Sequence, residues 1–184
     1  IAQVAALAGY EVVMRDIEPA LVERGIDAVD DSLSRLVQKD ELTQADAETA
    51  KNRITGTTAL DDLANADLVV EAAPEKMEIK QDIFTDLDRI CDSDVLLATN
   101  TSTLSITTIG AATERPGLVV GLHFMNPVPI MDGVEIVVGE RTKPAIVDLS
   151  HAFAEALGKE TCESDDKPGF VTNRILMPWI NEGI

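Results

Sequence analysis

Basic and aromatic residues are both scarce in this chain of 184 residues. Lys and Arg number 15 against 33 Asp and Glu, so the formal net charge is −18, and aromatic residues make up 3%. A chain of this charge is repelled by nucleic acid phosphates and by anionic lipid, so we expect neither nucleic acid nor a membrane as a partner. No apolar run is long enough to cross a bilayer. No charged leader with a cleavage site precedes the first elements, so the pattern indicates a cytoplasmic protein.

Cysteine and histidine are also rare, with two of each. Cys91 and Cys162 lie far apart, form no Cys-x-x-Cys motif and match no spacing of metal ligands, so we expect reduced thiols and no metal site. The acidic excess is spread along the chain rather than gathered in a tail. Such a dispersed acidic surface is typical of a protein that works in high salt, where self-repulsion is screened. An ordinary acidic cytosolic protein is the alternative.

Apolar patterning predicts strands and helices in alternation. The hydrophobic content of 45% is enough for a core. We expect the end of a helix at 1–9, stopped by Gly9, and a long helix from Pro19. Further helices are expected at 44–53, 76–91, 105–110, 144–157 and from 168, and strands at 10–14, 54–58, 67–72, 95–99, 118–123 and 135–138. This order predicts a doubly wound α/β domain over residues 1–167, followed at 168–184 by the first helix of a second, helical domain.

A short apolar strand delivers His123 into the turn Phe124-Met-Asn-Pro127. Histidine titrates near neutral pH, so at a strand end it can take up and return a proton during a reaction. A lone histidine is more often a satisfied core residue. Three features favour chemistry here: Glu135 on another apolar run, the polar segment Asn100-Thr101-Ser102 after the preceding strand, and Asn173 at a helix start.

Acidic residues also follow two other strands. Asp16 ends the first one, where a carboxylate can accept hydrogen bonds from both hydroxyls of an adenosine ribose and disfavour a 2′-phosphate. A surface Asp at a strand end is common, so this signal is weak by itself. Glu75 and Lys80 follow the strand at 67–72; they are either a simple helix start with a charge pair, or a pair beside the ribose of a nicotinamide.

Several motifs occur together and in order: Glu71-x-x-x-Glu75, Asn100-Thr-Ser-Thr-Leu104, Gly121-Leu-His-Phe-Met-Asn-Pro-Val128, Glu135-Ile-Val137 and Asp166-Lys-Pro-Gly-Phe-Val-x-Asn-Arg174. Over essentially its whole length the chain resembles the 3-hydroxyacyl-CoA dehydrogenase family, and most of all its 3-hydroxybutyryl-CoA dehydrogenases. The sequence departs from the family at both ends. It contains neither the Gly-rich loop with its first strand nor more than the opening helix of the C-terminal dimerisation domain.

The resemblance implies a Rossmann-type fold and an NAD-dependent oxidation of (S)-3-hydroxyacyl-CoA to 3-oxoacyl-CoA, or the reverse. His123 would be the general acid and base, and Glu135 would orient its ring and stabilise the imidazolium. Ser102 and Asn173 would bind the reacting oxygen and the thioester carbonyl. Each has a simpler reading, since Ser and Asn often cap helices and Glu135 could be a solvent-facing strand residue.

The resemblance also implies partners. The cofactor NAD would contact five residues, namely Asp16, Glu75, Lys80, Ser102 and Asn126. The substrate would be an acyl-CoA, and the protein would form a homodimer through the C-terminal helical domain. Two other functions stay open at this point: the dehydrogenase part of a bifunctional β-oxidation enzyme, and a nucleotide-binding relative without turnover.

Overall fold

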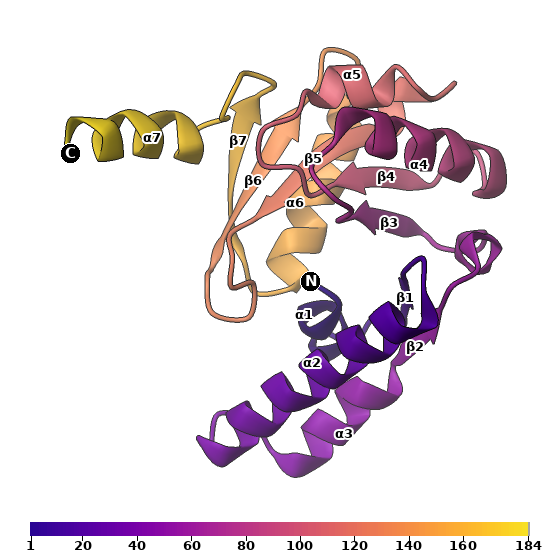
Figure 1. Ribbon diagram of the computed structural model, residues 1–184, viewed down its shortest axis with the longest axis vertical. Coiled ribbons are helices and arrows are strands. Elements are labelled where there is room, and N and C mark those ends of the chain that lie inside the picture. The colour runs from indigo at the N-terminus through magenta and orange to yellow at the C-terminus, as the bar shows by residue number, and fades with distance from the viewer. Residues whose placement is uncertain (184) are drawn as a thin grey trace. The chain divides into compact units, whose positions relative to one another are not determined.

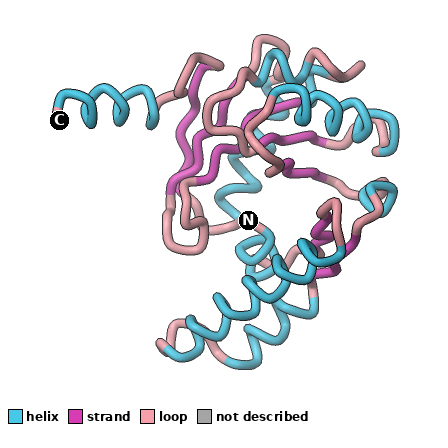
Figure 2. The backbone as a smooth tube through the Cα atoms, viewed as in Figure 1, coloured by secondary structure: helices cyan, strands magenta, loops and turns pink. Residues whose placement is uncertain are grey.

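The computed structural model describes residues 1–183, which divide into two compact units. The first unit holds residues 1–63 with 126–131, and the second holds residues 64–125 with those from Asp132 onward. Helices and strands alternate along most of the chain (Figure 2). Within the described residues, no helix is both long enough and apolar enough to cross a membrane.

The first unit is a small α/β layer. Its elements are α1 (Ala2–Leu7), β1 (Val12–Arg15), α2 (Pro19–Gln38), α3 (Gln44–Asn52), β2 (Ile54–Thr57) and the short 3₁₀ helix η1 (Leu60–Leu63). Strands β1 and β2 pair in parallel, and helices α2 and α3 lie side by side (Figure 1). The small residues Ala6, Ala47 and Ala50 bury against Leu33, which lets the helices approach closely.

Gly9 and Pro19 take the places in this unit that were predicted for them. Gly9 has φ +101° after α1, a conformation that glycine adopts without steric cost, and Pro19 is the first residue of α2. Thr43 caps α3, because its Oγ1 accepts a hydrogen bond from Asp46 N at 3.1 Å.

The second unit is a five-stranded sheet in the order β3-β4-β5-β6-β7. Its strands are β3 (Leu68–Glu71), β4 (Leu96–Thr99), β5 (Val119–Phe124), β6 (Gly133–Val138) and β7 (Glu160–Asp165). Its helices are α4 (Met77–Ile90), α5 (Ile106–Gly110), η2 (Pro116–Leu118), α6 (Pro144–Ala156) and α7 (Thr172–Glu182). Helices α4 and α5 lie in front of the sheet and α6 behind it (Figure 1), so β4 and β5 are buried over their whole length.

The sheet is mixed, because β6 runs antiparallel to β5 although the other pairs are parallel. Two expectations about its elements need correction. Strand β7 was not predicted, since Glu-Thr-Cys-Glu-Ser-Asp is polar and lies at the sheet edge, where no apolar alternation is required. The last helix begins at Thr172 rather than Pro168, because Gly169 and Phe170 both have positive φ and interrupt any helix there.

Candidate active site

Three parallel strands bring polar segments to one edge of the five-stranded sheet. Because β3, β4 and β5 run in the same direction, their carboxyl ends meet there. Glu71 ends β3, Asn100 follows β4, and His123 is the last residue but one of β5. The Asn100 side chain ties two of these ends together, since its Oδ1 accepts a hydrogen bond from Phe124 N at 2.9 Å.

His123 and Glu135 form a buried pair at this edge. Antiparallel pairing of β5 with β6 places the two residues directly opposite each other, and His123 Nδ1 lies 2.6 Å from Glu135 Oε2. Both side chains are buried, with His123 7% and Glu135 1% exposed. An ionised carboxylate only accepts hydrogen bonds, so Nδ1 carries the proton and the lone pair of the neutral imidazole is on Nε2.

The other ring nitrogen remains free for a substrate. Among residues 1–183, Nε2 forms no hydrogen bond with a protein atom. Because it is not one of the fully buried polar atoms that lack a partner, this nitrogen is open to solvent. The edge of the Phe170 ring packs on the imidazole at a centroid distance of 5.8 Å. This packing limits how the ring can rotate.

The start of α7 holds the Glu135 carboxylate from its other side. Glu135 Oε1 accepts hydrogen bonds from Val171 N at 2.9 Å and Thr172 N at 2.7 Å. Burial alone raises the pKa of Glu135, but hydrogen bonds from His123, Thr172 and Val171 outweigh it and lower the pKa below its ordinary value. Glu135 is therefore ionised and can balance the charge of an imidazolium.

A second carboxylate organises the loop after β4. Glu75 Oε1 accepts hydrogen bonds from Ser102 N at 2.9 Å and from the backbone and hydroxyl of Thr103, both at 3.1 Å. The Thr101 hydroxyl donates to the same oxygen at 2.5 Å. Burial raises the pKa of Glu75, but these bonds lower it overall. Asn173 reaches the same loop, because its Nδ2 donates to Ser102 O at 3.3 Å.

Lys80 is more deeply placed than the sequence suggested. Its side chain is 1% exposed, and Nζ donates to Glu71 Oε1 at 2.8 Å, to Glu71 Oε2 at 3.0 Å and to Ala73 O at 3.1 Å. Glu75 Oε2 lies 3.6 Å from the same nitrogen. The ammonium is thus occupied by protein oxygens, which argues against a direct contact between Lys80 and a cofactor. Its position close to Glu75 Oε2 indicates that Lys80 stabilises the Glu75 carboxylate instead.

Glu71 was not predicted as a site residue. Its side chain is buried between Lys80 and the Thr99 hydroxyl, which donates to Oε2 at 2.7 Å. The sequence did contain a signal for this pair: a glutamate ends an apolar strand, and a lysine follows nine residues later on a helix. Buried charges require such partners.

Two of the predicted site residues belong to the first unit. Asp16 directly follows β1, is half-buried, and accepts a hydrogen bond from Ile17 N at 2.7 Å through Oδ1. Asn126 is exposed in the segment 126–131. The remaining predicted residues, His123, Glu135, Ser102, Asn173, Glu75 and Lys80, all lie in the second unit.

Comparison with known proteins gives a consistent result. Residues 1–167 match the model of the family described as 3-hydroxyacyl-CoA dehydrogenase, NAD binding domain. Over all 184 residues the chain is 44% identical to a 3-hydroxybutyryl-CoA dehydrogenase of Bradyrhizobium diazoefficiens and 45% identical to a probable one of Deinococcus radiodurans.

A solved structure is equally similar. The crystal structure of (S)-3-hydroxybutyryl-CoA dehydrogenase from Ralstonia eutropha has a TM-score of 0.96 at 44% identity, over 98% of this chain and 64% of that one. The chain spans 63% of the length of the Bradyrhizobium relative and 66% of the Deinococcus relative.

Proposed function

Because the chain belongs to the 3-hydroxyacyl-CoA dehydrogenase family, we propose that its protein interconverts (S)-3-hydroxyacyl-CoA and 3-oxoacyl-CoA with NAD. The single observation that carries the proposal is the buried His123–Glu135 pair, with Nδ1 bound and Nε2 free. The printed names of the most similar relatives support a short acyl chain such as 3-hydroxybutyryl.

In the oxidative direction, His123 Nε2 takes the proton of the 3-hydroxyl as the C3–O bond becomes a carbonyl. NAD, when bound, supplies the acceptor for the hydride that leaves C3. The imidazolium that forms shares its Nδ1 proton with Glu135, whose ionised state offsets the new charge. In the reductive direction His123 returns the proton to the alkoxide oxygen.

Ser102 and Asn173 are proposed to bind the reacting oxygen and the thioester carbonyl. The bond from Asn173 Nδ2 to Ser102 O supports a joint role, since it places the two residues side by side. Donors held in position in this way polarise a carbonyl without a cost of reorganisation during the reaction.

Carboxylates at strand ends suit the hydroxyl donors of NAD. Asp16 would accept from the adenosine ribose. Glu75 would accept from the nicotinamide ribose through Oε2, because Oε1 already binds the loop and the side chain is 41% exposed. Ser102 and Asn126 would add polar contacts. Lys80 would act by holding Glu71 and Glu75 rather than by touching the cofactor.

A second candidate is the dehydrogenase part of a larger enzyme. The chain is 37% identical, over 97% of its length, to a fatty acid oxidation complex subunit alpha of Ectopseudomonas oleovorans, of which it covers 25%. The sequence of the whole protein decides between the two, because an attached hydratase domain would identify the bifunctional form.

Assembly and setting are also proposals. The exposed apolar residues Ile175, Met177 and Trp179 of α7 support a helical domain that starts near residue 168, covers this helix and pairs two copies. The net charge of −18 supports adaptation to high salt, and the presence of only two cysteines, without a Cys-x-x-Cys motif, supports reduced thiols in a cytoplasmic protein. Equal melting temperatures in dilute buffer and in concentrated KCl would contradict the salt adaptation.

The first experiment measures NADH oxidation with acetoacetyl-CoA by the full-length protein and its His123→Ala variant. Loss of a general acid and base lowers turnover by about 10²–10⁴. The matched control is His151→Ala, which removes the other histidine, on α6. A wild-type protein that binds NADH and leaves acetoacetyl-CoA unchanged would support a relative without this activity.

A further inference from the structure

Asp166, on the turn between β7 and α7, binds a helix start in another part of the second unit. Its Oδ1 accepts from Ile106 N at 3.0 Å, and its Oδ2 accepts from Thr107 N and from the Ser105 hydroxyl, both at 2.8 Å. Burial raises the pKa of Asp166, but these donors lower it overall. The carboxylate is thus ionised and fixes the turn to the start of α5.

Both partners of this contact lead directly into the site. Ser105 ends the loop that carries Ser102, and Asp166 begins the turn that reaches Val171 and Thr172. The amides of those two residues hold Glu135, and Asn173 comes next in the chain and bonds to Ser102. The Asp166 carboxylate therefore links the loop that carries Ser102 to the segment whose amides bind Glu135.

The turn is tightly shaped between Asp166 and the amides. Gly169 has φ +77°, and a Cβ there would meet Arg174 N at 3.0 Å; Phe170 has φ +49°, which is rare for a bulky residue. Phe170 is also 3% exposed and packs on the His123 ring. A backbone held in such conformations persists only where its surroundings determine it, and Asp166 is the anchor at its start.

We propose that Asp166 is a positioning residue that sets the protonation behaviour of His123 through Glu135. When Asp166 holds the turn, two amides share the charge of Glu135 with the imidazole. When the turn relaxes, the amides withdraw, the carboxylate is left more basic, and the imidazolium is favoured. This inference rests on the proposed function only for its kinetic readout.

The other ionisable groups near His123 do not replace this effect. Glu135 faces it from β6, and Cys162 lies next in the same cross-strand row on β7, where burial and the charge of Glu135 raise the pKa of its thiol. Helix α5 carries no charged residue. In the turn, Lys167 is exposed and lies 4.0 Å from Asp165, away from the carboxylate of Asp166.

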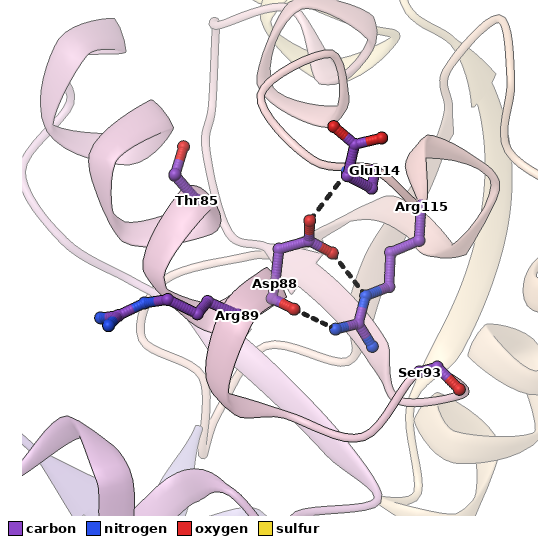
Figure 3. A pocket seen from close by; sticks show the side chains of 6 residues that line it. All are labelled: Thr85, Asp88, Arg89, Ser93, Glu114 and Arg115. Atoms are coloured by element: carbon purple, nitrogen blue, oxygen red, sulfur yellow. Dashed lines mark hydrogen bonds and ion pairs between the residues drawn. The ribbon is translucent and has the colours of Figure 1, made fainter.

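The test compares Asp166→Asn with Asp88→Asn in the full-length protein. Asp88 is an equally half-buried carboxylate that accepts from Glu114 N at 2.8 Å and from Arg115 Nε at 2.6 Å, and it lies at the end of α4 (Figure 3). Both variants lose contacts to backbone amides and lower the melting temperature. Only Asp166 is connected to the start of α7.

Two readouts separate positioning from simple stability. The first is the titration of His123 by NMR, assigned with His123→Ala, and the second is the acidic limb of kcat/KM for oxidation. In Asp166→Asn we expect both midpoints to rise by roughly half a pH unit or more, the scale of weakened carboxylate hydrogen bonds. In Asp88→Asn we expect both to stay at the wild-type value.

Each other outcome overturns the proposal. An unchanged titration in Asp166→Asn, an equal change in Asp88→Asn, or a lower midpoint, which would indicate loss of the His123–Glu135 bond itself, contradicts it. If Asp166→Asn does not fold, Ser105→Ala removes one donor and must show a smaller rise. The NMR titration needs no turnover, so a wild-type protein inactive toward acetoacetyl-CoA would refute the proposed function and leave this comparison intact.

Discussion

Replacing Glu135 by Gln should reverse the tautomer of His123. The side chain has one oxygen on two amides, Val171 N and Thr172 N, and one on His123 Nδ1. A Gln must turn its carbonyl toward the amides, because its NH₂ would otherwise face two donors. The NH₂ then faces Nδ1, which becomes an acceptor, so that the proton moves to Nε2 and the base is lost.

The expected loss is large. Replacing the orienting carboxylate of a catalytic triad by its amide lowers turnover by about 10⁴. For the two-residue arrangement here we expect a fall in kcat of about 10²–10⁴, or about 3–5 kcal/mol of transition-state stabilisation. The assay is NADH oxidation with acetoacetyl-CoA at saturating substrate.

The control is Glu163→Gln, the same change at the other histidine–glutamate pair, where His151 Nε2 lies 3.1 Å from Glu163 Oε1. That variant should keep wild-type turnover. If Glu135→Gln keeps kcat within a few-fold of wild type, the tautomer argument is wrong.

The same substitution should change acid stability. The pKa of Glu135 is lowered from 4.5, so its contribution to the free energy of unfolding is present above that value and is lost as the pH falls through the lower, folded value. Glu135→Gln has no such group. In urea unfolding series below pH 4.5, wild type should lose stability more steeply than the variant. Parallel curves would contradict the assigned ionisation.

Two further predictions concern the sheet that carries the site. Lys80→Met should lower the free energy of unfolding by about 3–5 kcal/mol in urea titrations, because it leaves Glu71 buried without its cation. Adding Glu71→Gln to Lys80→Met should recover part of that loss. If the two substitutions instead lower the free energy of unfolding additively, the residues are not coupled. Gly121→Ala should cost about 1–3 kcal/mol in the same assay, since its Cβ would lie 2.7 Å from Val137 Cβ and 2.9 Å from Ile106 Cδ1; wild-type stability would show that the strand can shift freely.

Many elements of the fold were readable because their signals are local. The apolar runs of β4 and β5, the proline at the start of α2 and the threonine cap of α3 each depend on residues within one or two turns of chain. Strand β7 was not predicted because an edge strand needs no apolar pattern, and its place is decided by pairing with β6.

The sequence placed candidate site residues at strand ends but did not show which of them contact one another. His123, Ser102 and Glu75 stand at the ends of strands or directly after them, where parallel strands gather side chains at one edge. The part played by Lys80 was not readable, because helical spacing places it near Glu75 but cannot show that Glu71 would bury its ammonium. Asp166 lies in a recognisable motif, but its role could not be predicted, because the groups that donate hydrogen bonds to it lie about sixty residues away in the chain.

The sequence by itself determined the order of most strands and helices, β7 excepted, and which polar residues would stand at strand ends, because periodicity, caps and turns act over short stretches of chain. Only the tertiary structure decided the antiparallel register that sets Glu135 opposite His123, and the return of the chain that brings two amides of α7 to the same carboxylate. Pairing register and chain return depend on contacts between distant segments, and a local pattern does not specify which distant segment will arrive.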